Sequence, residues 1–132
     1  MLPNYTALVT LLAIALYFST GIMVARARRT FGVDVPATSG HADFERVFRV
    51  QQNTLEWMPI FLPSLWLFAF AVGDVWAAAG GVVWIIGRLV YIAGYSDASE
   101  RRHAGFFIQM IACAVLWCGA AVAVVLRMMH GG

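Results

Sequence analysis

Long uncharged stretches alternate with short polar segments along the chain and divide it into four parts. Residues 5–25 contain no charged side chain, and at about 1.5 Å per residue this run can cross a hydrocarbon core of about 30 Å. Apolar residues also dominate 75–95 and 104–126, while 42–73 favours one long helix that starts with charged turns and becomes apolar from Trp57. The pattern predicts four membrane spans within a single all-α domain of residues 1–132. Their expected bounds are about 5–27, 43–72, 75–95 and 103–127.

Three polar connections separate these runs, at residues 30–41, 73–74 and 96–101. The middle one is so short that it predicts a tight antiparallel return between the second and third spans. The third span also contains small residues that favour close approach of another helix. These are Gly80, Gly81 and Gly87.

Composition supports the membrane assignment, because 61% of the residues are hydrophobic and only 12% are charged, whereas soluble chains are about a quarter charged. Arginines follow the first apolar run instead of preceding it, so we expect a retained span and not a cleaved signal peptide. Cys113 and Cys118 lie about 140° apart on one predicted helix, cannot form a disulfide within it, and are interpreted as small hydrophobic residues. No zinc-ligand spacing is present, and we expect no metal and no nucleic acid partner.

Arginines concentrate at the first and third connections. Arg26, Arg28 and Arg29 flank the first and Arg101 and Arg102 flank the third, while the opposite side has only Arg127. The positive-inside rule therefore predicts that loops 1 and 3 are cytoplasmic. We expect a multi-pass integral membrane protein, in the inner membrane of a bacterium or in the endoplasmic reticulum or nuclear envelope of a eukaryote.

A stripe of polar residues enters the second span. Arg46, Arg49, Asn53 and Glu56 are spaced by three, four and three residues, which places them within an arc of roughly 80° on one helix face. Charged residues at membrane depth are costly unless they face a protein interior or a wet cavity. The stripe therefore predicts a functional site.

A second polar face lies on the third span, where Arg88, Tyr91 and Tyr95 are spaced by three and four residues. We interpret Arg88 as structural, paired with a carboxylate such as Glu56. The other groups suit a small ligand with carboxylates and an ammonium group, and an arginine beside a thiol would favour the reactive thiolate. A small peptide thiol fits, although an arginine-rich pocket also suits nucleotides or lipid headgroups; no glycine-rich phosphate loop supports the nucleotide.

Two segments carry a resemblance to a known family. FERVFRVQQNTLEWMPIF and GRLVYIAGYSDASERRHAGF resemble the MAPEG family of membrane-associated proteins in eicosanoid and glutathione metabolism, nearest to the branch of microsomal glutathione transferase type two and leukotriene C synthase. The similarity extends from about Arg28 to Phe106 without an insertion. It implies a four-helix subunit, a homotrimer, and glutathione bound as co-substrate between neighbouring subunits near the cytosolic surface.

The resemblance also implies roles for individual residues. Arg102 matches the arginine that holds the glutathione thiolate, and Arg29 matches a second arginine that is sometimes assigned an acid role. Arg28 and Gln51 match ligands from the adjacent subunit; Gln51 lies about 160° around the helix from Arg49 and Asn53, which agrees with service to a neighbour's site. The remaining matches to glutathione ligands in the same subunit are Arg49, Asn53, Glu56, Trp57, Tyr91 and Tyr95.

This chain departs from the family pattern at two positions. Trp57 stands where relatives usually have tyrosine or phenylalanine, so a phenol hydrogen bond is lost while an aromatic wall remains. Ala114 stands where leukotriene C synthase has a tryptophan that caps the substrate, and Trp117 lies one turn away. These departures favour a broader specificity than dedicated leukotriene synthesis.

The resemblance implies a glutathione transferase that conjugates the thiolate to lipophilic electrophiles, with a possible glutathione-dependent peroxidase activity on lipid hydroperoxides. The alternatives are a non-enzymatic lipid-binding scaffold of the lipoxygenase-activating type and a small oligomeric transporter with an arginine-lined pore. The scaffold relative lacks much of the glutathione set that this chain keeps. Membrane lipid is an expected partner.

Overall fold

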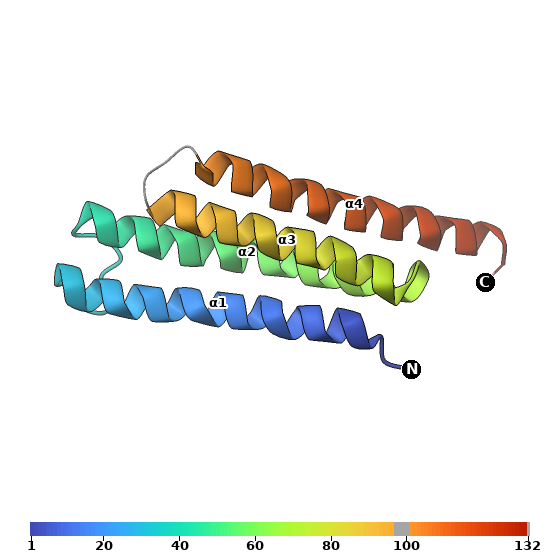
Figure 1. Ribbon diagram of the computed structural model, residues 1–132, viewed down its shortest axis with the longest axis horizontal. Coiled ribbons are helices and arrows are strands. Elements are labelled where there is room, and N and C mark those ends of the chain that lie inside the picture. The colour runs from blue at the N-terminus through green and yellow to red at the C-terminus, as the bar shows by residue number, and fades with distance from the viewer. Residues whose placement is uncertain (97–100, 132) are drawn as a thin grey trace.

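Four helices make up the fold, in agreement with the predicted all-α class (Figure 1). The computed structural model describes residues 1–96 and 101–131, so residues 97–100 of the predicted third connection lie outside the described residues. Each helix is long and apolar enough to cross a membrane. The helices are α1 (Asn4–Phe31), α2 (Ala42–Ala71), α3 (Asp74–Ser96) and α4 (Arg101–Met129).

The helices run antiparallel to their neighbours in sequence, and both chain ends lie at the same end of the bundle (Figure 1). α1 packs on one side of the α2–α3 pair, and α4 packs on the other side. The loop between α1 and α2, the end of α3 and the start of α4 meet at the end opposite the termini. The polar residues of α2 and α3 therefore lie near this same end.

The interior of the bundle is apolar over most of its length. The rings of Phe61 and Trp84 stack with centroids 4.0 Å apart, and Leu65 and Leu116 are fully buried around them. Many large apolar side chains on the outer faces are exposed, as expected for helices that face lipid. The predicted polar faces of α2 and α3 thus lie at one end of a bundle whose interior is mostly apolar (Figure 1).

Glycines allow α3 and α4 to approach closely beside the polar end. A Cβ atom added to Gly87 would lie 2.6 Å from the backbone nitrogen of Gln109, and one added to Gly105 would lie 2.2 Å from the backbone nitrogen of Tyr91. These distances exclude a side chain at either position without movement of the backbone. The predicted close approach is confirmed at Gly87, and Gly105 supplies the matching position on α4.

Polar contacts also join the helices at the end of the bundle where the two termini lie. The Asp74 carboxylate at the start of α3 accepts hydrogen bonds from the backbone N–H groups of Tyr5 (3.1 Å) and Thr6 (2.8 Å) and from the Thr6 hydroxyl (2.7 Å). It thereby caps the otherwise unpaired first turn of α1. Arg127 donates to the carbonyl oxygens of Phe70 and Ala71 at the end of α2. These contacts attach the tight turn between α2 and α3 to α1 on one side and to α4 on the other.

Candidate functional site

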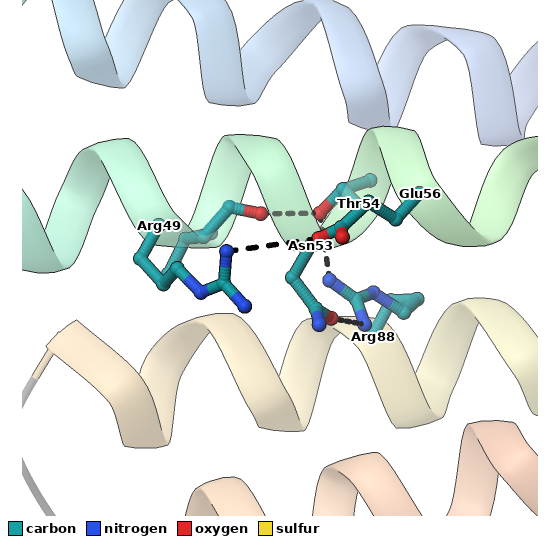
Figure 2. Close-up of polar contacts among 6 residues, drawn as sticks. Arg49, Asn53, Thr54, Glu56 and Arg88 are labelled. Carbon is teal, nitrogen blue, oxygen red and sulfur yellow. Dashed lines mark hydrogen bonds and ion pairs between the residues drawn. The ribbon is translucent and has the colours of Figure 1, made fainter. Parts of the chain in front are cut away.

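α2 carries the charged centre of the candidate site. Arg49, Asn53 and Glu56 share the predicted face, and a loose ion pair of 3.8 Å joins the guanidinium of Arg49 to the carboxylate of Glu56 (Figure 2). Their side chains are 59% and 57% exposed, so the pair contributes little to stability. Each charge therefore remains available to an oppositely charged group of a ligand.

Arg88 of α3 lies beneath this face and is fully buried. Its Nη1 donates to Oδ1 of Asn53 and its Nη2 donates to Oγ1 of Thr54, both at 2.7 Å (Figure 2). The expected pairing of Arg88 with the Glu56 carboxylate is wrong, because Glu56 points outward and pairs with Arg49. An amide and a hydroxyl instead accept hydrogen bonds from the two terminal nitrogens of the buried guanidinium.

Aromatic rings extend the site from α2 across α3 to α4. The ring centroids of Tyr91 and Tyr95 are 5.4 Å apart, and Phe106 of α4 lies 6.1 Å from Tyr91 and 5.7 Å from Trp57. The guanidinium carbon of Arg102 lies 5.4 Å from the Tyr95 ring centroid. One end of the bundle thus gathers cations and aromatic rings from three helices.

Seven of the ten residues proposed from the sequence belong to this group. They are Arg49, Asn53, Glu56, Trp57, Tyr91, Tyr95 and Arg102. Two openings flank them. A polar groove of about 500 Å³ is lined by Arg46, Arg49 and Tyr95 with parts of the α1–α2 loop, and an apolar groove of about 330 Å³ runs from Trp57 along α4.

The other three proposed residues lie on the α1 side. Gln51 lines an apolar groove against α1, with its Nε2 atom 3.4 Å from the position that a Cβ of Gly21 would occupy. Arg28 donates to the carbonyl oxygen of Ala37 at 2.7 Å and stacks over Phe44, so it holds the α1–α2 loop. Arg29 is exposed at the end of α1. The assignment of Gln51 and Arg28 to a neighbour's site stays a prediction, as does the acid role of Arg29.

The structure adds residues that sequence reasoning did not select. Phe106 follows Arg102 by four residues, and this helical spacing was the available signal that both face the same site. His41 caps α2 by accepting a hydrogen bond from the N–H of Asp43 at 3.1 Å, and it stacks on Phe31. His41 thereby fixes where the charged face of α2 begins.

The apolar groove shows what surrounds Ala114, which stands where leukotriene C synthase has a tryptophan. Ala114 and Trp117 both line this groove, together with Trp57, so the indole that lies one turn away reaches the same surface. The wall of the groove is otherwise built from Ile60, Met110 and two cysteines. Such a surface suits an apolar ligand without marking a particular one.

Fold and site together define a multi-pass membrane protein with an open, arginine-rich polar site beside an apolar groove. Comparison with known proteins identifies its family: the MAPEG family model matches residues 6–130. The chain belongs to the MAPEG family.

The chain is also similar to individual proteins. The chain is 47% identical to the uncharacterized protein sll1147 of Synechocystis sp. over 91% of this chain and 88% of that protein. It is 41% identical to human microsomal glutathione S-transferase 2 over 76% of this chain and 67% of that protein. It is 36% identical to rat leukotriene C4 synthase over 95% of this chain and 83% of that protein.

Proposed function

We propose that the protein is a membrane-bound glutathione transferase that joins the thiolate of glutathione to lipophilic electrophiles. The observation that carries this proposal is the convergence of Arg49, Asn53, Glu56, Tyr95 and Arg102 beside an apolar groove. The names of the transferase and synthase relatives support the same activity. A scaffold would not need this set of charges, which makes the scaffold alternative the weaker one.

The charges of the site match those of glutathione. Arg49 suits a carboxylate, and Glu56 suits the ammonium group. Because these two side chains form only a loose, exposed pair in the free site, a zwitterionic ligand replaces one weak contact with two stronger ones.

Arg102 is the residue that we assign to thiolate stabilisation. It lies in the first turn of α4, where the helix dipole also favours a negative charge. Both effects lower the pKa of the glutathione thiol from its ordinary value of about 8.5 and increase the fraction of thiolate at neutral pH. The thiol proton passes to solvent when the thiolate forms.

The apolar groove would hold the electrophile, which enters from the bilayer. With an aryl halide, the sulfur attacks the carbon that carries the halogen, a C–S bond forms, and the halide leaves with its electron pair. With an epoxide, the sulfur attacks a ring carbon and a C–S bond forms as the C–O bond breaks. The ring oxygen then takes a proton from Arg29, the proposed acid, which regains a proton from solvent. The rate then derives from thiolate stabilisation and from orientation of the two reactants.

The same thiolate would reduce lipid hydroperoxides. Its sulfur attacks a peroxide oxygen, the O–O bond breaks, and the lipid leaves as an alcohol after protonation. The sulfenic form of glutathione then condenses with a second glutathione to give the disulfide and water. This activity needs no group beyond those proposed for conjugation.

We further propose that the working unit is a homotrimer. Gln51, Arg28 and Arg29 lie on the α1 side, away from the group formed by α2, α3 and α4. If the family's ligand set is complete in this protein, a second copy has to present Gln51 and Arg28 to each site. Loops 1 and 3 would face the cytoplasm, where glutathione is supplied.

Conjugation of glutathione to chlorodinitrobenzene by the purified protein in detergent tests the proposal. We expect Arg102→Ala to lower kcat by about 100-fold and to abolish the ultraviolet absorbance of bound thiolate, because one preorganised charge is removed. Arg127→Ala removes the same charge at the far end of α4 and serves as the control. A full rate and full thiolate absorbance in Arg102→Ala would contradict the proposed mechanism. Reduction of a lipid hydroperoxide, measured in parallel, tests the peroxidase activity.

A further inference from the structure

Arg88 is a buried cation that the proposed mechanism does not use. Its side chain is 0% exposed inside a membrane-spanning bundle, and no carboxylate among the described residues pairs with it. Its Nε also has no hydrogen-bond partner within the described part of the chain. A buried charge of this kind is costly, and a well-packed apolar residue would often serve stability as well or better. We therefore expect Arg88 to have a role other than packing.

The contacts of Arg88 reach two residues of the candidate site. Its forked guanidinium binds Asn53 and its sequence neighbour Thr54 on α2, each at 2.7 Å. Its guanidinium carbon also lies 4.3 Å from the ring centroid of Tyr91. Asn53 and Tyr91 are both proposed glutathione ligands, while Thr54 is fully buried.

The chemistry of these groups determines how the Asn53 amide is turned. Arginine has only donors, so the atom of Asn53 that meets Arg88 must be the carbonyl oxygen Oδ1. The NH₂ group of Asn53 is then directed away from Arg88. Asn53 is half-buried at the edge of the site, so this NH₂ group is the part of the amide that a ligand can reach.

We propose that Arg88 is a positioning residue that holds the Asn53 amide with its NH₂ group toward the ligand, so that Asn53 recognises an acceptor oxygen of glutathione. The acceptor is a carboxylate or a peptide carbonyl, and not an N–H or ammonium group. The inference rests on the proposed function, because glutathione is the ligand. Arg88 itself does not touch the ligand.

The first test measures glutathione affinity by calorimetry in detergent for the wild type, Arg88→Met, Asn53→Ala and the double variant. Each single variant should raise the dissociation constant about tenfold, the effect of one hydrogen bond of about 1.4 kcal/mol. If Arg88 acts through Asn53, the double variant should also be about tenfold weaker. An increase closer to 100-fold, or an unchanged affinity in folded Arg88→Met, would overturn the proposal.

Substitution of a buried arginine can prevent folding, so a second variant leaves Arg88 in place. Thr54→Val removes one of the two acceptors that orient the guanidinium, and it should raise the dissociation constant about threefold in the presence of Asn53 but not in Asn53→Ala. Trp66→Phe is the matched control, because it removes the hydrogen bond from Trp66 to Thr10 between α1 and α2 near the other end. The control should leave glutathione affinity unchanged; equal loss in both variants would indicate general destabilisation and overturn the proposal.

The donor role of Asn53 has its own test. Asn53→Asp keeps an oxygen for Arg88 but replaces the NH₂ group with a second oxygen, which repels an acceptor on the ligand. We expect glutathione binding to weaken more than tenfold, and equal or tighter binding would overturn the assigned orientation.

Kinetics separate positioning from catalysis. Arg88→Lys should raise KM for glutathione while kcat and the thiolate absorbance stay within about twofold of the wild type, since Arg102 is unchanged. A fall in kcat at constant KM would overturn the positioning role. A wild-type protein that binds no glutathione would instead overturn the proposed function and this inference with it.

Discussion

Replacement of Gly105 by alanine should separate α4 from α3 at the candidate site. A Cβ atom at this position would lie 2.2 Å from the backbone nitrogen of Tyr91, 2.7 Å from its Cα and 2.7 Å from the carbonyl oxygen of Gly87. All three neighbours are backbone atoms, so no side chain can rotate away. The shortest distance falls about 1.2 Å below the 3.4 Å at which ordinary contact begins, and the two helices have to separate to accommodate the methyl group.

The magnitude follows from this displacement. Overpacking of a close helix contact costs up to about 3 kcal/mol, against a gain of about 1 kcal/mol from replacing glycine with alanine in a helix, so we expect a net loss of stability. Arg102 lies one turn from Gly105 on α4 and 5.4 Å from the Tyr95 ring, so it moves with the helix. A misplacement near 1 Å at the reacting group lowers the rate by about 100-fold.

Gly80→Ala provides the matched control on α3. Its added Cβ would meet only side-chain atoms of Leu116, the nearest at 2.9 Å, and a leucine end can shift. Both variants gain the same helix propensity, so the difference between them reports the backbone clash. We expect thermal unfolding in detergent and glutathione conjugation to be impaired in Gly105→Ala and nearly unchanged in Gly80→Ala. Wild-type stability and rate in Gly105→Ala would refute the reasoning.

Three further predictions concern separate features. Asp74→Ala should lower the midpoint of thermal unfolding, because α1 loses its cap, while the exposed control Asp34→Ala should not; equal midpoints would contradict the capping role. Gln109→Leu should leave the midpoint unchanged or raise it, because the amide of Gln109 is fully buried and has no hydrogen-bond partner among the described residues, a cost of about 1–3 kcal/mol. A marked fall would show that the amide is satisfied in the folded protein. Glu56→Gln should weaken glutathione binding about tenfold at constant stability, since its ion pair is loose and exposed; unchanged affinity would exclude a role in binding the ammonium group.

Much of the fold follows from hydropathy, because only a helix satisfies its own backbone in a membrane and about 20 residues suffice to span one. Helical periodicity likewise predicted that Asn53 and Glu56 share one face of α2, and that Tyr91 and Tyr95 share one face of α3. These are relations within single helices. They depend on spacing along the chain and need no knowledge of neighbouring elements.

Relations between helices were harder to predict. Spacing assigns Arg88 to a face of α3, but it does not determine which turn of α2 lies opposite or how far α2 is rotated. A carboxylate was expected because buried charges are usually paired, yet the rotation of α2 directs Glu56 outward and brings Asn53 and Thr54 to the guanidinium. The capping role of His41 was missed for the same reason, since it depends on how the loop meets α2.

Arg49 and Gln51 lie on different faces of α2. This arrangement gives a test of the proposed homotrimer that depends on neither stability nor the identity of the substrate. Arg49 faces the group formed with α3 and α4, whereas Gln51 faces α1. If each site takes Arg49 from one subunit and Gln51 from the next, subunits with Arg49→Ala and subunits with Gln51→Ala can restore each other. Every mixed trimer then contains one intact site, and random mixing in equal amounts makes about one quarter of all sites wild type. If both side chains served the same subunit, mixing would restore none, and glutathione conjugation would remain at the level of the separate variants.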